Sequence, residues 1–565
     1  MNKFSRFAFI VSLLAAQHTQ AQHTNIPLGN EEYHLLDRLE TRSGSLSGQM
    51  HLSIKPVDRG AAVAMVQQFK SDFYSAGLSN IDYYNINRAI ALSGEYAAPD
   101  GNGAIDSKHN LFNTFYAKQT DFLHLQRNGF LFILNPILGG TGIKENNSGN
   151  LQYNATQGVE LRAKFRNYAG LYFSIANNYE QPVSFYKDWI EKFQAVPGAG
   201  PYKKTGDGYR YAKVRGYATV PLIAKHVSLA IGYDQHFLGD GYRSLFLSDF
   251  SEGALFAGIS THIWKLKYQN LYLKLQPQTL PSGEPQTGNK YATAHYLSLN
   301  LTRWLNMGLF ESVTFSRKGG YDFAYLNPVI FYRAIERGLG SPDKVSIGFS
   351  AKAIVAKHLN FYAQVLINEF TLKELASGNG YWANKWGLQL GTKYYDAFGI
   401  PNLDIQLEGN VVRPYTFQHY DNAEGLPMTN YTHYNTPLAH PLGAGFAELN
   451  VLLNYQPLPR LAISAQGMYY RQGIDTNGSN NGSNLLFSYT TRSSDYGIGF
   501  INGPEANCLL GSLNLSYELR PRLYIDVNGT YRKYAVASTP TLSNNTWYAS
   551  AGLRLNLNRH NYNQF

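Results

Sequence analysis

Side chains near the C-terminus sort by the parity of their residue numbers. Between residues 547 and 557 the odd positions are apolar, whereas most even positions are polar or small. Because successive side chains of a β-strand point to opposite faces, this segment predicts a strand with one apolar and one polar face. About ten such residues suit a tilted strand that crosses a bilayer, although a strand of a soluble sandwich would alternate too. The chain ends on Phe565, and we expect this segment to be the terminal strand of a barrel.

The alternation of short turns and long loops extends this pattern over most of the chain. The segments 455–461 and 517–523 share the spacing Tyr-x-x-x-Pro-Arg-Leu, and each joins two alternating apolar runs. Long segments rich in Gly, Asn and Tyr separate such turns, at 177–212, 317–345, 413–446 and 472–505. Tight turns at one end and long loops at the other are typical of outer-membrane barrels, whose short turns face the periplasm. We therefore predict an all-β fold, a transmembrane antiparallel barrel of 16–18 strands over residues 108–565, and we favour 18.

Composition agrees with a strand-and-turn protein. The chain has 43 Tyr, 31 Phe and 52 Gly, and only 16% of its residues are charged. Its mean hydropathy of −0.30 is compatible with a membrane barrel, because only every second residue of a barrel strand faces the lipid. The net charge of +10 favours acidic partners, such as an acidic polysaccharide or a lipopolysaccharide phosphate.

The first residues predict export. Lys3 and Arg6 precede an apolar stretch at 7–16, and Thr19-Gln20-Ala21 offers a cleavage site, so we assign 1–21 as a signal peptide. Nucleic acid is not an expected partner of an exported chain. The single cysteine, Cys508, excludes an internal disulfide and a cysteine-cluster metal site.

Residues 22–107 differ from the rest of the chain. Asn30 is placed to cap a short helix, Asp58 a second one, and a third is predicted from Ser79 to Leu92. Short helices of this kind make a poor independent domain. We therefore expect a small N-terminal helical region that docks onto the barrel.

Several stretches resemble a known family. Residues 239–249 read Gly-Asp-Gly-Tyr-Arg-Ser-Leu-Phe-Leu-Ser-Asp, which resembles the Gly-x-Gly-aromatic-x-Ser-Leu-x-Leu-Ser stretch of the Wzi family of capsule-assembly outer-membrane proteins. Residues 26–30 with 36–39, 326–333 and 437–443 resemble its Bacteroidetes branch, which includes the gliding-motility surface protein RemB. The resemblance implies 18 strands, a helical bundle at the periplasmic end and loops that occlude the pore. It also implies lectin-like binding of capsular or exopolysaccharide without catalysis.

Sugar recognition needs flat aromatic faces together with fixed charged or amide groups. The candidate ligand-binding residues that combine these chemistries in or beside predicted loops are Tyr186, Lys187, Trp189, Asp240, Tyr242, Arg243, Arg333, Tyr431 and Tyr434. Each also has an internal interpretation: Trp189 packing within a plug, and Asp240 with Arg243, or Arg333 with Glu336, forming internal ion pairs.

No metal site or cofactor is expected. His419, His433 and His440 share one loop, but their spacing does not specify a metal geometry. The sequence has no Gly-x-Ser-x-Gly elbow and no His-Glu-x-x-His pair, so we expect no enzymatic activity.

The expected function is therefore binding or organisation of surface polysaccharide by loops of an outer-membrane barrel. One alternative is a surface component of gliding-motility or adhesion machinery that acts through protein partners. A third is a diffusion porin, against which the long aromatic loops argue.

Overall fold

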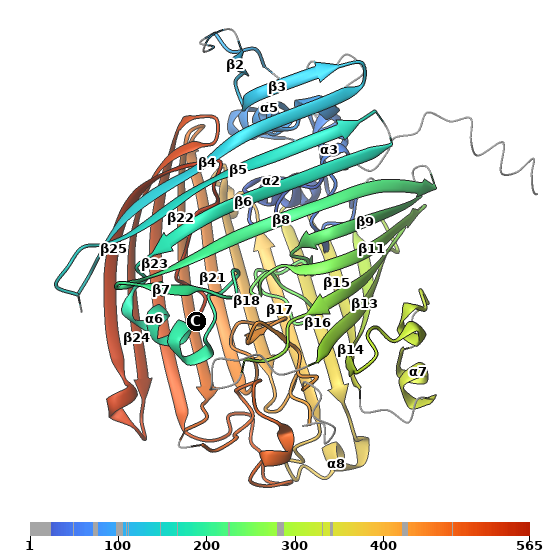
Figure 1. The fold of residues 1–565 in the computed structure, drawn as a ribbon, viewed down its shortest axis with the longest axis vertical. Coiled ribbons are helices and arrows are strands. Elements are labelled where there is room, and N and C mark those ends of the chain that lie inside the picture. The colour runs from blue at the N-terminus through green and yellow to red at the C-terminus, as the bar shows by residue number, and fades with distance from the viewer. Residues whose placement is uncertain are drawn as a thin grey trace, which may run out of the picture.

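The computed structural model describes residues 24–565 apart from 49, 72–76, 98–104, 109, 111, 113, 147, 167, 224–225, 280–287, 330–331, 339–342, 421–427 and 477. The predicted signal peptide lies outside the described residues. Over the described chain, antiparallel strands close into one barrel (Figure 1).

The barrel wall has 18 strands in the described part of the chain, and it closes where β25 pairs with β4. This confirms the preferred strand number. The wall strands are β4 (Phe130–Glu145), β5 (Gln152–Phe165), β6 (Ala169–Glu180), β8 (Gly208–Ile223), β9 (Val227–Asp234), β11 (Ala254–Ile263), β12 (Leu266–Leu275), β13 (Asn289–Asn300), β14 (Leu305–Arg317), β15 (Lys344–Val355), β16 (Leu359–Glu369), β17 (Lys385–Tyr394), β18 (Leu403–Val412), β21 (Phe446–Leu458), β22 (Leu461–Gly473), β23 (Glu505–Arg520), β24 (Leu523–Val536) and β25 (Asn544–Leu555).

The remaining strands and helices lie outside the set of 18 wall strands. The hairpin of β2 and β3 extends the sheet beside the first residues of β4. The strands outside the wall are β1 (Ile54–Lys55), β2 (Phe115–Lys118), β3 (Asp121–Arg127), β7 (Lys203–Thr205), β10 (Phe237–Leu238), β19 (Thr432–His433) and β20 (Thr436–Pro437). The helices are α2 (Glu32–Ser43), α3 (Arg59–Ser71), α5 (Asn80–Leu92), α6 (Ser184–Phe193), α7 (Tyr332–Gly338), α8 (Leu372–Ala376), η1 (Gly94–Tyr96), η2 (Phe323–Leu326), η3 (Ala397–Gly399), η4 (Tyr489–Thr491) and η5 (Pro540–Leu542).

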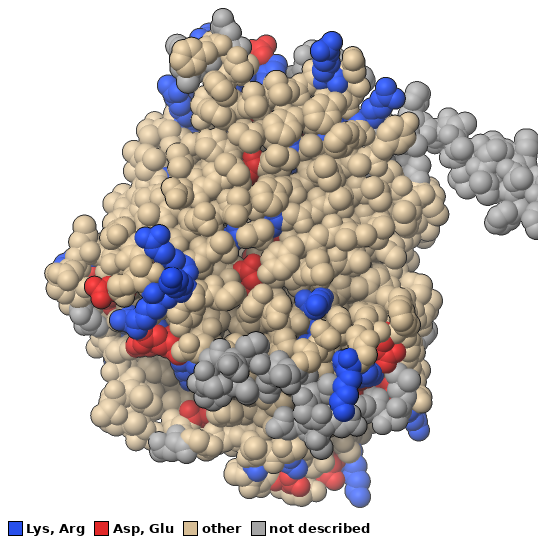
Figure 2. Space-filling view, viewed as in Figure 1, with Lys and Arg blue, Asp and Glu red and all other residues tan. Residues whose placement is uncertain are grey.

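The two faces of the last strand follow the predicted alternation of odd and even residues. In β25 the odd residues Trp547 and Leu553 are 51% and 46% exposed, whereas Tyr548 and Arg554 are buried inside the barrel. The outward residues of the other strands are also mostly apolar, and charged side chains are sparse over the wall strands in Figure 2. Such a surface matches the hydrocarbon of a bilayer. Separately, no described helix is both long and apolar enough to span a membrane.

The end of the chain differs from the prediction. The strand stops at Leu555, and Phe565 does not close it. Residues 556–565 instead turn into the lumen, where the C-terminus lies among the wall strands in Figure 1. His560 contacts Glu180 and Arg559 contacts Ser464, so polar side chains of the wall hold this C-terminal tail. Strand parity cannot reveal a tail that leaves the sheet.

The N-terminal helices pack at the short-turn end of the barrel (Figure 1). Leu36, Leu39, Val66 and Ile86 are among the buried residues of their common core. Asp58 accepts a hydrogen bond from the Ala61 N–H at 2.7 Å, as expected for a cap. The predicted cap of the second helix is therefore present, and this helix also packs against the other two.

The caps of the other two helices differ in outcome. Ser79 begins α5 with a capping box that also uses Asp82. The prediction for the first helix was wrong in one detail, because Glu31 occupies the capping position and makes no side-chain cap bond. Asn30 instead donates its side-chain amide to Glu32, at 3.2 Å. The helix starts nonetheless because its apolar face is buried against the other helices.

Ion pairs attach these helices to the wall. Arg38 of α2 bridges Asp82 of α5 to Asp396 and Asp404 of the barrel, at 2.7, 2.6 and 2.5 Å. The Arg38 side chain is only 3% exposed. Burial alone would lower the pKa of Arg38, but the three carboxylates outweigh burial and raise that pKa above its usual value. The helical region is therefore a plug bonded to the barrel at its periplasmic end.

Candidate functional site

The predicted ligand-binding residues do not converge on one site. They fall into three places: the helix and loops that fill the barrel mouth, an inner loop that lies against the plug, and the outside of the wall. In that order they are Tyr186, Lys187, Trp189, Tyr431 and Tyr434; then Asp240, Tyr242 and Arg243; and finally Arg333.

Helix α6 lies in the barrel mouth and packs against the C-terminal tail. The Tyr186 and Trp189 rings stack on the Phe565 ring, with centroids 5.5 and 5.2 Å apart. Tyr186 is 1% exposed, and Trp189 is half-buried beside Phe250. Lys187 is also half-buried. The aromatic pair thus contacts the protein's own C-terminus, in the manner of the internal plug considered above.

The loop 413–445 contributes Tyr431 and Tyr434 to the same interior. The Tyr431 hydroxyl donates to the Phe246 carbonyl at 2.8 Å, and its ring stacks on Phe417. Tyr434 is half-buried and packs over Gly200, whose positive φ of +65° brings the backbone close to the ring. Both tyrosines hold loops together inside the mouth.

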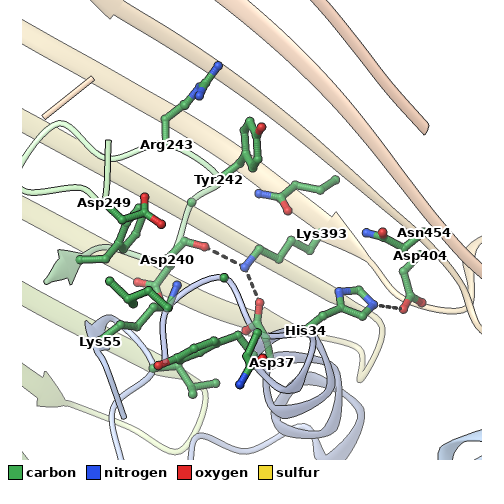
Figure 3. Close-up of a pocket in the computed structure, with 18 of the residues that line it drawn as sticks. His34, Asp37, Lys55, Asp240, Tyr242, Arg243, Asp249, Lys393, Asp404 and Asn454 are labelled. Atoms are coloured by element: carbon green, nitrogen blue, oxygen red, sulfur yellow. Dashed lines mark hydrogen bonds and ion pairs between the residues drawn. The ribbon is translucent and has the colours of Figure 1, made fainter. Parts of the chain in front are cut away.

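Asp240, Tyr242 and Arg243 lie on an inner loop, between β10 and β11, that crosses the lumen (Figure 3). Asp240 contacts Lys352 at 3.3 Å, and its carbonyl accepts a hydrogen bond from Lys393 at 2.7 Å. Arg243 contacts Glu448 at 3.4 Å. Two ion pairs and one hydrogen bond thus fix the inner loop to the barrel wall.

The same inner loop borders a polar cavity of about 460 Å³ against helix α2 (Figure 3). Burial alone would raise the pKa of Asp37, but Lys393 and Lys352 outweigh it and hold that pKa well below its usual range. Burial lowers the pKa of Lys55, which also lines the cavity, to about 8. The charges of this cavity mostly pair with one another, and these pairs join the plug and the inner loop to the barrel wall.

Arg333 is separated from all of these residues. It belongs to α7, which lies outside the wall in Figure 1, and its side chain is 61% exposed. It contacts Glu336 at 3.1 Å.

A different set of residues, five aromatic side chains and one arginine, lies at the extracellular rim. We call this set the rim cluster: Tyr381, Trp382, Tyr420, Tyr489, Arg492 and Tyr496. The Arg492 guanidinium lies 3.9 Å from the centre of the Trp382 ring, and the Tyr489 ring is 4.8 Å from that ring. Tyr381 faces Tyr496 at 5.4 Å, and Tyr496 is 51% exposed.

The rim cluster joins three loops that are far apart in the sequence, 370–384, 413–445 and 474–504. The sequence pattern does not predict it, because no spacing in one loop indicates contact with another. One local signal is present: the adjacent pair Tyr381-Trp382 follows Gly378-Asn379-Gly380 in a polar loop. Aromatic faces beside a guanidinium can stack on the apolar side of a sugar and read its polar groups.

No group of three or more metal-ligating side chains is arranged around a common point in the described chain. Burial lowers the pKa of His433 to about 4, and His419 and His440 also have lowered pKa values because they are buried. The His440 ring nitrogen contacts Glu448 at 2.9 Å. These histidines therefore hold the loops of the barrel mouth.

Comparison with known proteins places the fold. No family model matches the chain, and no curated protein matches it in sequence. Among solved structures, it is similar to Wzi of Escherichia coli, described as an outer-membrane protein involved in group 1 capsule assembly and as a carbohydrate-binding β-barrel. That similarity has a TM-score of 0.57 at 12% identity and covers 95% of this chain and 100% of Wzi. The outer-membrane protein OprD of Pseudomonas aeruginosa matches with a TM-score of 0.42 at 11% identity, covering 75% of this chain and 95% of OprD.

The RemB-like branch is not tested by these comparisons and stays a prediction. The closed wall, its apolar outer surface and the similarity to Wzi agree on location. The chain is an outer-membrane β-barrel with a Wzi-like fold.

Proposed function

We propose that this chain is a non-catalytic, lectin-like barrel that binds capsular or exopolysaccharide at the cell surface. The rim cluster carries the proposal, because it places the exposed Tyr496 ring beside the half-buried Tyr381 ring at the extracellular end. The description of the similar E. coli barrel as carbohydrate-binding supports the same class of ligand. An excess of cationic side chains, 49 Lys and Arg against 39 Asp and Glu, favours an acidic polysaccharide.

The filled lumen favours binding over passage of solutes. The plug occupies the periplasmic end, and α6, the inner loop and the C-terminal tail occupy the middle and mouth. We therefore rank the diffusion-porin alternative below polysaccharide binding. A large single-channel conductance of the purified protein would reverse this order.

The test is binding of the purified protein to the exopolysaccharide of its own organism. We expect the double variant Tyr381→Ala/Tyr496→Ala to weaken binding about thirtyfold, because two lost stacking contacts of about 1 kcal/mol each remove about 2 kcal/mol. The matched control is Tyr168→Ala, which removes a tyrosine that is 69% exposed at a short periplasmic turn. Absence of binding by the wild type would reject the lectin proposal, and equal losses in both variants would reject the rim cluster as its site.

The motility alternative has a separate test. A deletion strain that retains its capsule but loses surface spreading would favour a role in gliding or adhesion machinery. A strain that loses its capsule and spreads normally would favour polysaccharide organisation.

A further inference from the structure

One extracellular loop folds back over the outside of the barrel. We call residues 318–338, as far as they are described, the outer-wall loop; it includes η2 and α7 and lies beside the wall in Figure 1. Tyr325 and Tyr332 of this loop are fully buried against Val313 and Phe315 of β14 and Val345 of β15. These wall residues point away from the lumen, because they share the parity of the lipid-facing Leu309 and Ile347.

The wall under this loop is polar where lipid would otherwise touch it. Asn270, His295 and Glu311 are paired in register on β12, β13 and β14, and all are at most 3% exposed. Glu311 accepts the Arg333 backbone N–H at 3.0 Å, and the His295 ring nitrogen contacts the Tyr332 hydroxyl at 2.5 Å. Charged groups on a lipid-facing wall are costly, so the loop takes the place of lipid over this polar row.

The opposite side of the outer-wall loop is apolar. Phe323, Val329 and Leu326 are 79%, 55% and 42% exposed. Such a group of apolar side chains is unfavourable in water, but on the outside of a wall whose exposed residues include Leu309 and Ile347 it continues the apolar surface. The loop is thus placed to enter the outer leaflet.

The exposed charges of the loop have one sign. Its neighbouring acids are engaged internally: Asp322 and Asp343 pair with Arg317, at 3.0 and 2.5 Å, and the buried Glu336 pairs with Arg333. Among the described residues of the loop, the exposed charged side chains are Lys318, Arg333 and Arg337. A guanidinium recognises a phosphate through paired, charge-assisted hydrogen bonds.

We infer that the outer-wall loop is a docking surface for a phosphorylated lipid of the outer leaflet. Phe323, Leu326 and Val329 contact its acyl chains, and Arg333 and Arg337 bind its phosphate groups. This inference does not depend on polysaccharide binding, because the rim cluster lies on other loops. It also gives Arg333 a partner different from the glycan predicted for it from the sequence.

The experiment measures lipid binding to the full-length protein in detergent by native mass spectrometry. The probes are bisphosphorylated lipid A, the same lipid without phosphates, and inorganic phosphate. We expect bisphosphorylated lipid A to bind at least about tenfold more tightly than the dephosphorylated lipid, and inorganic phosphate not to compete, because the acyl contacts are missing. Equal affinity for the two lipids, or full competition by inorganic phosphate, would overturn the inference.

Variants locate the surface. Arg333→Ala/Arg337→Ala is expected to remove the preference for the phosphorylated lipid. Phe323→Ser should weaken the binding of both lipids and keep the preference for the phosphorylated one. The matched control is Lys203→Ala/Arg210→Ala, an exposed cationic pair that faces across β7 and β8. Retention of heat-modifiable migration in gels checks that each variant is folded, and Arg333→Lys/Arg337→Lys, which keeps the charge, should bind with at least partial preference. A control pair that loses as much preference as the arginine pair would contradict the assignment.

Discussion

Arg38 makes the most specific stability prediction, because one side chain holds three carboxylates at the junction of plug and barrel. In Arg38→Ala, Asp82, Asp404 and Asp396 stay in place with side chains 0%, 7% and 12% exposed. Removing one partner of a buried ion pair costs about 3–5 kcal/mol. Some compensation remains, since Arg42 still contacts Asp396 at 3.2 Å. We therefore expect a loss of about 4 kcal/mol, near the middle of that range.

Hydrogen exchange of peptides from α2 and α5 measures this free energy, because it reports local opening of the plug. A loss of about 4 kcal/mol corresponds to exchange about a thousandfold faster at pH 7. The matched control is Arg127→Ala on the exposed end of the β3 hairpin, which should leave plug exchange unchanged. An opening free energy for Arg38→Ala within about 1 kcal/mol of the wild type would refute the reasoning.

The pH dependence gives a second check on the same variant. Burial alone would raise the pKa of Asp82, but Arg38 and Ser79 outweigh it and lower that pKa in the folded protein. A lowered pKa stabilises the fold above the unfolded value, and this stability is lost as the pH falls through the folded one. In Arg38→Ala burial is no longer outweighed by Arg38, so Asp82 protonates more readily. The difference between variant and wild type should therefore shrink as the pH falls below about 4, and a constant difference would contradict the ion-pair explanation.

Three further predictions concern other parts of the barrel. Burial raises the pKa of Glu252 to about 7, so between about pH 4.5 and pH 7 the folded protein keeps a proton that the unfolded chain releases. The free energy of unfolding should therefore fall as the pH rises from about 4.5 to about 7. Urea titrations should show this slope in the wild type, and Glu252→Gln should remove it. Phe565→Ala removes a ring that is 5% exposed, which costs about 3–5 kcal/mol of tail docking, and carboxypeptidase should then trim the C-terminus much faster than in the wild type. Leu513→Arg places a charge on an outward position that is 50% exposed near the middle of β23, and we expect a cost of about 2–4 kcal/mol in unfolding from lipid vesicles. Leu513→Met, which keeps an apolar side chain of similar volume at the same position, should have little effect.

Parity of side chains is enough to define the two faces of the wall. Trp547 and Leu553 face outward, and Tyr548 and Arg554 face inward, because strand geometry leaves each side chain only one of two faces. The turns at 455–461 and 517–523 are predictable for the same local reason. Leu458 pairs with Leu461 and Arg520 with Leu523, so each turn closes a hairpin between neighbours in sequence.

The candidate sites depend on contacts that local patterns do not encode. Trp189 has the aromatic face that suits a sugar, but only the fold shows Phe565 stacked on it, from the far end of the chain. The sequence leaves Asp240 and Arg243 open to an external or an internal interpretation, and the partners that settle their position, Lys352 and Glu448, come from distant strands.

The sequence alone is sufficient for the barrel, the approximate strand number and the presence of N-terminal helices, because these follow from periodicity, caps and turn chemistry within a few residues of each other. Tertiary structure decides what fills the lumen, where the C-terminal tail lies and which aromatic residues meet at the rim. Those arrangements arise when loops fold into a space that the closed wall creates. Their energies come from burial and ion pairing between segments that approach one another only after the wall has closed.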